Sequence, residues 1–231
     1  MPKPLAPLPR ALTRTLFRLW VGLFGALIWS TPAMAIEEPP HEVIHAEGPF
    51  EIRHYPALLV AETVVDGDMD QASNQGFRRI AQYIFGYNQL PGTDEAGRIA
   101  MTAPVTVEPQ SARIAMTAPV TVEPTASADM AQAMRWRIHF VMPRHYTLDN
   151  IPKPKSEDVQ LREIPPKYMV VHRYTWLNTA SRVQQKTDET LAWARQRSLR
   201  VIGTPQLARY DPPLMPPMFR RNEIHVEIEK P

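Results

Sequence analysis

The chain has 231 residues, of which 44% are hydrophobic and 22% are charged, a balance that excludes an intrinsically disordered protein. It has no cysteine, which excludes disulfides, thiolate zinc sites, iron–sulfur clusters and cysteine nucleophiles. Its 25 prolines follow no period, which excludes a collagen-like chain.

Residues 1–35 have the pattern of a secretory signal peptide. Basic residues and no acidic ones come first, and the apolar run LWVGLFGALIW follows at 19–29. The segment ends at Ala33-Met34-Ala35, which fits an A-x-A cleavage site. The run is shorter than the roughly 20 apolar residues of a membrane-spanning helix. We predict cleavage after Ala35; the alternative is an N-terminal anchor that stays in the membrane.

Cleavage would change the net charge of the chain. The leader has 4 basic and no acidic residues, so residues 36–231 have 22 basic and 24 acidic side chains, a net charge of −2. This charge gives no global attraction to nucleic acid or anionic lipid, and we expect neither as a partner. We predict one domain, 36–231, that is periplasmic or secreted and has no stable membrane span after leader cleavage.

Helices and central strands are expected in the two longest proline-free windows after the leader, 57–90 and 167–204. In the first window, the β-branched and apolar residues of 57–65 predict a strand. A helix follows over 69–87, because apolar residues recur there at spacings of three and four. Its apolar stripe comprises Phe77, Ile80, Ala81 and Ile84.

The segment RIAMTAPVTVEP occurs twice, at 98–109 and at 113–124. Such identity indicates a local duplication, and two copies are too few for a solenoid. Val-Thr-Val is strand-like. The simplest interpretation is two neighbouring strands joined near 109–111; the alternative is one strand in the sheet and one copy in a projecting loop.

Residues 136–142 alternate between apolar and polar side chains, which predicts a half-buried antiparallel strand with His139 on the polar face. The second proline-free window begins with a strand at 168–176, where His172 is expected in the core or at its rim. A helix follows, capped by Asn178 or Thr179 and ending near residue 200.

The last strand, at 224–228, has the same alternation and is expected to turn His225 outward. Acidic residues that we also expect on the surface are Glu51, Glu62 and Glu223. The order strand–strand–helix–strands occurs twice. It predicts an α+β fold, a distorted antiparallel β-barrel or curved sheet flanked by two α-helices, with pseudo-twofold symmetry from two similar halves.

Five segments, taken in order, resemble the SOUL haem-binding family. They are GPFEIRHY at 48–55, YIFGYN at 83–88, IAMTAPV at 99–105, FVMP at 140–143, and YDPP at 210–213 followed by RRNEI at 220–224. Together they span nearly all of the chain after the leader. The resemblance implies a distorted barrel with two helices and a haem or related tetrapyrrole bound non-covalently, mostly by an apolar cleft.

The resemblance also implies a set of haem contacts. Some members carry a histidine proposed as the axial iron ligand, and this position is His54 here; the alternative is a structural hydrogen bond. Phe77 and Ala81 match positions placed against the porphyrin, and Ile84 extends the same stripe; the alternative for each is core packing. Ala81 is smaller than the residue of some members, which would reshape the slot.

Candidate cations for the haem propionates are Arg78, Arg79, Arg220 and Arg221, with solvated arginines as the alternative. Some family members have a lysine in the loop after YDPP, whereas this chain has LMPPMF at 214–219. That loop adds Met215 as an apolar contact or iron ligand, since a chain without cysteine offers iron only His, Met or Tyr.

We find no nucleophile-elbow, G-x-x-x-x-G-K, G-x-G-x-x-G or H-E-x-x-H motif. We therefore expect a binding protein and not an enzyme: a carrier, buffer or scavenger of haem outside the cytoplasm. Two alternatives stay open. One is a binding module for another amphipathic small molecule or a protein partner, and the other is an enzyme that modifies a tetrapyrrole.

Overall fold

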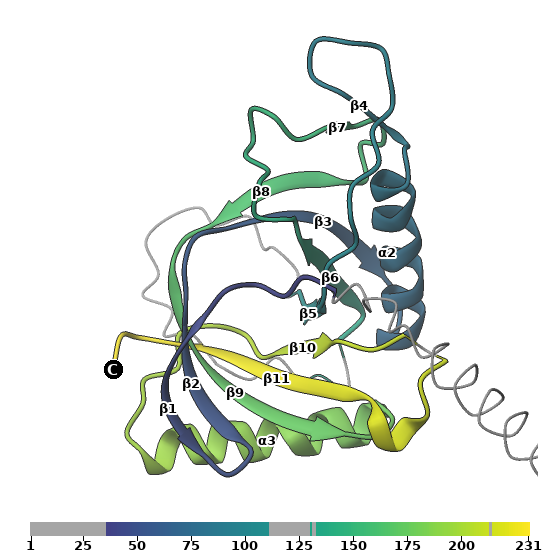
Figure 1. Cartoon of the computed structure of the whole chain (residues 1–231). Helices are drawn as coiled ribbons and strands as arrows, with labels where there is room; N and C mark the ends of the chain where they lie inside the picture. The colour runs from purple at the N-terminus through teal and green to yellow at the C-terminus, as the bar shows by residue number, and fades with distance from the viewer. Residues whose placement is uncertain (1–35, 111–129, 131–132, 213) are drawn as a thin grey trace, which may run out of the picture. The chain divides into compact units, whose positions relative to one another are not determined.

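Nine antiparallel strands form one curled sheet in the described part of the chain (Figure 1). This computed structural model describes residues 36–110, 130, 133–212 and 214–231. The strand order is β1-β2-β9-β11-β10-β5-β6-β3-β8, and β4 pairs with β7 in a separate two-stranded sheet. The bounds are β1 Glu42–Glu47, β2 Phe50–Tyr55, β3 Leu58–Asp66, β4 Asn88–Gln89, β5 Val105–Pro109, β6 Arg135–Val141, β7 Lys153–Pro154, β8 Gln160–Ile164, β9 Lys167–Thr175, β10 Gln206–Arg209 and β11 Arg221–Ile228, with helices α2 Met69–Ile84 and α3 Ala180–Gln196 and a short 3-10 helix, η1, Pro217–Phe219.

The strand order confirms the predicted pseudo-twofold arrangement. β5 and β10 pair at the centre of the sheet; outward from them lie β6, β3 and β8 on one side and β11, β9 and β2 on the other. The chain order β2–β3–α2–β5–β6 recurs as β8–β9–α3–β10–β11, so each of these eight strands has a counterpart at the symmetry-related place, and the edge strand β1 has none. β3 and β9 even share a length of 9 residues and the same burial pattern.

Both helices pack on the outer face of the curl. The cross-strand pairs place a row of apolar residues on that face, because Ile224 pairs with Leu207, Leu207 with Val107, and Val107 with Ile138. All four side chains are fully buried. α2 covers β3 and β6, while α3 covers β9 and β11, as Figure 1 shows. Residues from both helices therefore belong to one continuous hydrophobic core.

The helices begin where the sequence predicts. The Asp68 carboxylate accepts a hydrogen bond from the N–H of Asp70 at the start of α2, and the Thr179 hydroxyl caps α3 in the same way. α2 ends at Ile84, before the predicted residue 87. Just beyond its end, Gly86 adopts φ +121°, a conformation that glycine takes without steric cost.

The inner face of the curl is buried too, which corrects four predictions. Glu223 has no exposed surface, and Glu62, His139 and His225 are only 8%, 5% and 7% exposed, although we expected all four to face solvent. Their strands do alternate, with apolar side chains under the helices. The opposite face lies inside the curl, where other strands cover it. In these strands the alternating side chains therefore belong to two buried layers, an apolar one under the helices and a polar one inside the curl.

The first copy of the duplicated segment supplies β5. This strand pairs with β10 on one side and with β6 on the other. The prediction that the two copies are neighbouring strands is therefore wrong, because β5 has no edge left for a second copy. That second copy, at 113–124, lies outside the described residues.

Gly76 lets α2 approach β6 closely, and its replacement tests this packing. A Cβ at position 76 would lie 2.7–2.9 Å from three side-chain atoms of Ile138. We expect Gly76→Ala to lower the free energy of unfolding by about 1–3 kcal/mol, despite the better helix propensity of alanine. Urea titration followed by circular dichroism measures the change. Gln75→Ala, at an exposed position of the same turn, is the control, and equal stability of the two variants would contradict the packing.

Candidate functional site

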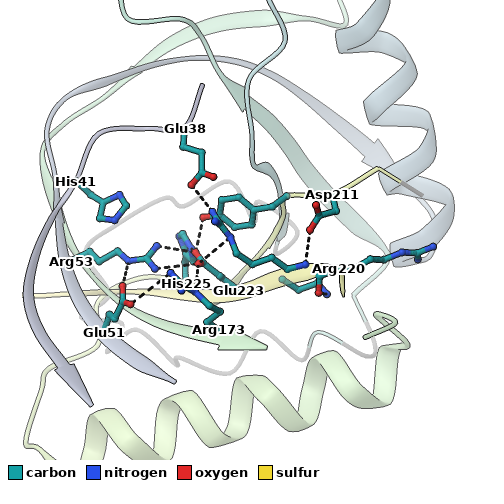
Figure 2. Close-up of polar contacts among 12 residues, drawn as sticks. Glu38, His41, Glu51, Arg53, Arg173, Asp211, Arg220, Glu223 and His225 are labelled. Atoms are coloured by element: carbon teal, nitrogen blue, oxygen red, sulfur yellow. Dashed lines mark hydrogen bonds and ion pairs between the residues drawn. The ribbon is translucent and has the colours of Figure 1, made fainter. Parts of the chain in front are cut away.

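A network of charged side chains occupies the inner face where β2, β9 and β11 lie side by side. Arg53 Nη1 and Nη2 donate hydrogen bonds to the two carboxylate oxygens of Glu223, at 2.9 and 3.1 Å. The same carboxylate accepts hydrogen bonds from the Tyr210 hydroxyl at 2.6 Å and from His225 Nε2 at 2.8 Å. Figure 2 shows Arg53 and His225 converging on Glu223. With Arg173 Nε, which donates at 3.4 Å, four side chains satisfy this buried carboxylate.

The centre of the network stays ionised. Burial alone would raise the pKa of Glu223, but hydrogen bonds from His225 and Arg53 hold this pKa well below its usual range. Burial opposes the charge of Arg53, yet the hydrogen bonds with Glu223 and Tyr55 leave the pKa of Arg53 raised. Burial and the neighbouring Glu223 raise the pKa of Tyr210, so its hydroxyl stays protonated and donates.

A small hollow, open to solvent, lies on the inner face beside this network; the roughly 480 Å³ of empty space at this place includes the solvent in front of it. Its lining is amphipathic. Apolar residues include Leu58, Val141, Ile164 and Met169, and polar residues include Tyr55, His139, Lys167, Gln206, Tyr210 and His225. Burial and the nearby cationic side chains lower the pKa of His139 to about 3, so its imidazole is neutral.

The first residues of the domain cross the open side of the curl (Figure 1). Glu37 forms a β-bridge with Thr102, and its carboxylate accepts a hydrogen bond from Arg144 Nε at 3.0 Å. The next residue, Glu38, pairs with Arg221, and Figure 2 shows Glu38 beside the charged network. Because Glu38 also lines the hollow, this segment forms one of its walls.

The candidate haem contacts on α2 differ in accessibility. Ile84 has no exposed surface and Ala81 is 8% exposed, whereas Phe77 is 39% exposed. The Phe77 ring lies 5.7 Å from the ring of Phe140, at the edge of the outer core. Arg78 follows it on the exposed side of the helix. α2 therefore presents one half-exposed aromatic ring next to a cation, and the hollow on the inner face has no α2 residue in its lining.

His54 lies far from α2 in the strand order. It is on the outer face of β2, where its ring stacks on Tyr168 with ring centroids 4.6 Å apart. Strands β9, β11, β10 and β5 separate β2 from β6, which underlies α2. The structure therefore does not bring His54 together with Phe77 on one stretch of the outer face.

Met215 and Arg220 lie in the connection between β10 and β11. Arg220 Nε donates a hydrogen bond to the Met215 carbonyl at 2.7 Å, and in Figure 2 the Arg220 side chain points away from the Glu223 network. At the end of β10, Arg209 Nη2 lies 3.4 Å from Asp70 Oδ1 in the first turn of α2. This connection thus leaves β10 beside α2.

Residues 36–112 and 108–227 match the profile of the SOUL heme-binding protein family. The chain belongs to the SOUL heme-binding family. The two matched segments together cover both pseudo-symmetric halves, in agreement with the five segments recognised in the sequence.

Two curated SOUL relatives match a shorter stretch. Heme-binding protein 2 of Homo sapiens is 41% identical over 86 residues, which is 34% of this chain and 40% of that protein. Heme-binding protein 2 of Mus musculus is 39% identical over 84 residues, which is 33% of this chain and 38% of that protein. The matched stretch thus spans about two fifths of these relatives.

Solved structures of low identity share the fold. The EcmrR C-terminal domain superposes with a TM-score of 0.54 at 12% identity, over 79% of this chain and 98% of that one. A hydrolase from Listeria innocua gives a TM-score of 0.50 at 13% identity, over 80% and 94%. These similarities concern the architecture alone.

Three further predictions can be compared with the described residues: metal binding, a membrane-spanning helix and the burial of His172. Among the described residues, no group of three or more His, Asp or Glu side chains is placed to hold a metal ion. In that same part of the chain, no helix is long and apolar enough to span a membrane. His172 is buried, as predicted, and its Nδ1 lies 3.3 Å from the Thr190 hydroxyl.

Sequence reasoning missed the inner-face residues Arg53, Glu223 and Lys167. Arg53 alternates with Ile52, and Glu223 precedes Ile224, so each looks like the solvent-facing member of a half-buried strand. The sequence did contain one indication of a polar cluster. Glu223 and His225 are two positions apart in one strand, so their side chains must share a face. The strand order was needed to show what that face meets.

Glu223→Gln tests the charged network. The substitution leaves the buried Arg53, which is 1% exposed, with only the partly buried Glu51 as a counter-charge, so we expect a loss of about 3–5 kcal/mol in unfolding free energy at neutral pH. The pKa of Glu223 is lower in the folded than in the unfolded chain. The stabilisation that its charge provides is therefore complete above the unfolded pKa of about 4.3 and is lost as the pH falls below that value. The Glu223→Gln variant should lack this loss of stability in acid.

Urea unfolding at pH 7 and in the acid range measures both effects. Glu229→Gln, which removes an exposed carboxylate paired with Arg200, is the control and should cost no more than about 1 kcal/mol. A Glu223 variant as stable as this control would rule out the network as the support of the inner face.

Proposed function

We propose that the domain of residues 36–231 binds haem or a related tetrapyrrole non-covalently and acts as a carrier, buffer or scavenger. The observation that carries this proposal is the SOUL heme-binding profile, which matches both halves of the domain. The names of the two curated relatives, both called Heme-binding protein 2, agree with it. Because the chain has no cysteine, it cannot hold haem through thioether bonds, so affinity must come from apolar contact, charge and any axial ligand to the iron.

The surface that suits a flat apolar ring lies on the outer edge of α2. Phe77 offers an exposed aromatic face there, and Arg78 offers a cation for a propionate. The β10–β11 connection starts beside the first turn of α2, where Arg209 meets Asp70, and we propose that its Met215, Arg220 and the 69% exposed Phe219 extend this surface. Apolar surface with adjacent cations is the chemistry that a porphyrin with two carboxylates needs.

The other predicted contacts have a smaller part in this arrangement. Ala81 and Ile84 lie under the exposed edge of α2, so they shape the surface and reach a ligand only if the helix shifts. His54 is on the outer face of β2, apart from α2. We propose that the ring is held by apolar contact and that His54 supplies little of the affinity.

A haem titration of the 36–231 chain, followed at the Soret band, tests the proposed function. We expect saturation at one haem per chain. Phe77→Ser should weaken binding at least about tenfold, because a buried phenylalanine contributes about 1.5–3 kcal/mol. His54→Ala should leave the affinity within about twofold. Val43→Ser, at an exposed position on β1, is the control. Failure to saturate, or equal affinities for the Phe77 and Val43 variants, would contradict the proposed site.

We also propose that residues 1–35 are a secretory leader and that the domain works in the periplasm or outside the cell. The basic start, the short apolar run and the A-x-A site support this. Expression of the full chain in a bacterial host should yield periplasmic protein whose intact mass, measured by mass spectrometry, corresponds to residues 36–231. Ala35→Gln should block cleavage, whereas Ala6→Gln, far from the cleavage site, should leave it unchanged. Purified protein that still contains residues 1–35 would refute the proposal.

A further inference from the structure

The hollow on the inner face has a lining with two chemically different parts. The apolar part includes Leu58, Val141 and Ile164. The polar part includes Lys167 at the start of β9 and His139 in the middle of β6. No residue of α2 contributes to either part, so this hollow is distinct from the surface proposed for haem.

Lys167 has unused hydrogen-bonding capacity. Its side chain is only 13% exposed, and its closest carboxylate, Glu227, has its oxygen 3.9 Å from Lys167 Nζ, which is beyond hydrogen-bond range. Burial lowers the pKa of Lys167, and Glu227 and Glu108 only partly oppose this effect. A second carboxylate close to the ammonium would therefore stabilise its charged form.

His139 adds an unsatisfied polar atom to the same part of the lining. It is 5% exposed, and its Nδ1 has no hydrogen-bond partner among the described residues. Besides burial, the charges of Lys167, Arg162 and Arg137 lower the pKa of His139, and Glu62, its cross-strand neighbour, is neutralised by Arg162. A buried polar atom without a partner costs about 1–3 kcal/mol, so a polar group that entered the hollow would find an uncompensated site in a positive environment.

Two acidic residues of the inner face, Glu62 and Glu223, are held by arginines. Glu62 accepts two hydrogen bonds from Arg162, at 2.9 and 2.7 Å. Glu223 is held by Arg53 at 2.9 Å. Glu38, which lines the hollow, pairs with Arg221, and the two inner-face acids whose carboxylates have no hydrogen bond among the described residues, Glu108 and Glu227, are not part of the lining. The spare hydrogen-bonding capacity of the lining is therefore on its cationic side, which favours an anion over a cation as ligand.

We propose that this hollow binds a small amphipathic carboxylate, with the carboxylate at Lys167 and His139 and the apolar part against Leu58, Val141 and Ile164. The site goes beyond the proposed haem function and does not depend on it. A carboxylate is the simplest anion that combines one negative charge with an attached hydrocarbon, which matches a lining with one ammonium and an apolar surface.

Calorimetric titration of the 36–231 chain with hexanoate, 1-hexanol and hexylammonium tests the charge requirement. The three probes carry hydrocarbon tails of similar length and differ in the head group. We expect hexanoate to bind at least about tenfold more tightly than either of the others, since a hydrogen bond to a charged group is worth about 1.5–3 kcal/mol. Equal affinities for hexanoate and 1-hexanol, or no binding of hexanoate, would overturn the proposal.

Two lysine variants locate the site. Lys167→Met keeps the approximate length of the side chain and removes the charge, and we expect it to weaken hexanoate binding at least about tenfold. Lys155→Met, at an exposed position, should leave it unchanged. Thermal unfolding checks that each variant is folded, and Lys167→Arg, which restores the charge, should recover most of the affinity. Unchanged hexanoate binding in a folded Lys167→Met protein would overturn the assignment.

Haem titration of the same variant identifies the source of the carboxylate. Haem affinity that is unchanged in Lys167→Met assigns the hollow to a free carboxylic acid. Haem affinity that falls in parallel with hexanoate affinity assigns it to a propionate of the tetrapyrrole. Both results support carboxylate recognition at Lys167, and loss of haem binding in Phe77→Ser with intact hexanoate binding separates this site from the proposed haem surface.

Discussion

The inner face of this sheet can be both buried and polar because Arg53 and Glu223 neutralise each other there. An isolated carboxylate with no exposed surface would cost several kcal/mol in lost hydration. Here Glu223 receives hydrogen bonds from Arg53, Tyr210 and His225, and Arg53 Nε also donates to Glu51 at 2.6 Å. The two charges come from β2 and β11, one in each pseudo-symmetric half. The pair therefore joins the halves on the inside, as the helix-covered core joins them on the outside.

The two faces of the sheet consequently offer different chemistry. The outer face is apolar and continuous under α2 and α3, and its exposed edge at Phe77 suits a large flat ring. The inner face is lined by ionic and hydrogen-bonding groups and contains a hollow whose lining is partly apolar. A single SOUL domain thus provides an apolar surface and a polar pocket on opposite sides of the same strands.

The sequence predicted the elements that have one apolar face, because burial on one side leaves a clear period. α2, α3, β3, β6, β9 and β11 all lie close to their expected ranges, and the repeated element order revealed the pseudo-twofold fold. The polar side of the same strands could not be interpreted in this way. Glu223 and His139 have the same alternation whether they face water or the inside of a curled sheet, and only the curl decides. The neighbours of β5 were likewise set by long-range pairing with β10, which leaves no local pattern.

The contact between Arg53 and Glu223 joins positions 170 residues apart in the chain. β2 lies beside β9, and β9 in turn pairs with β11, the last strand in chain order of the described sheet. β2 pairs with β1 locally but finds its second neighbour only when the C-terminal half is present, and such long-range pairings raise the contact order of the domain. Folding of such a topology is slow, because the entropy of closing long loops is lost before the distant contacts form. The N-terminal half alone would leave β2 paired only with β1 and the Arg53 guanidinium without Glu223.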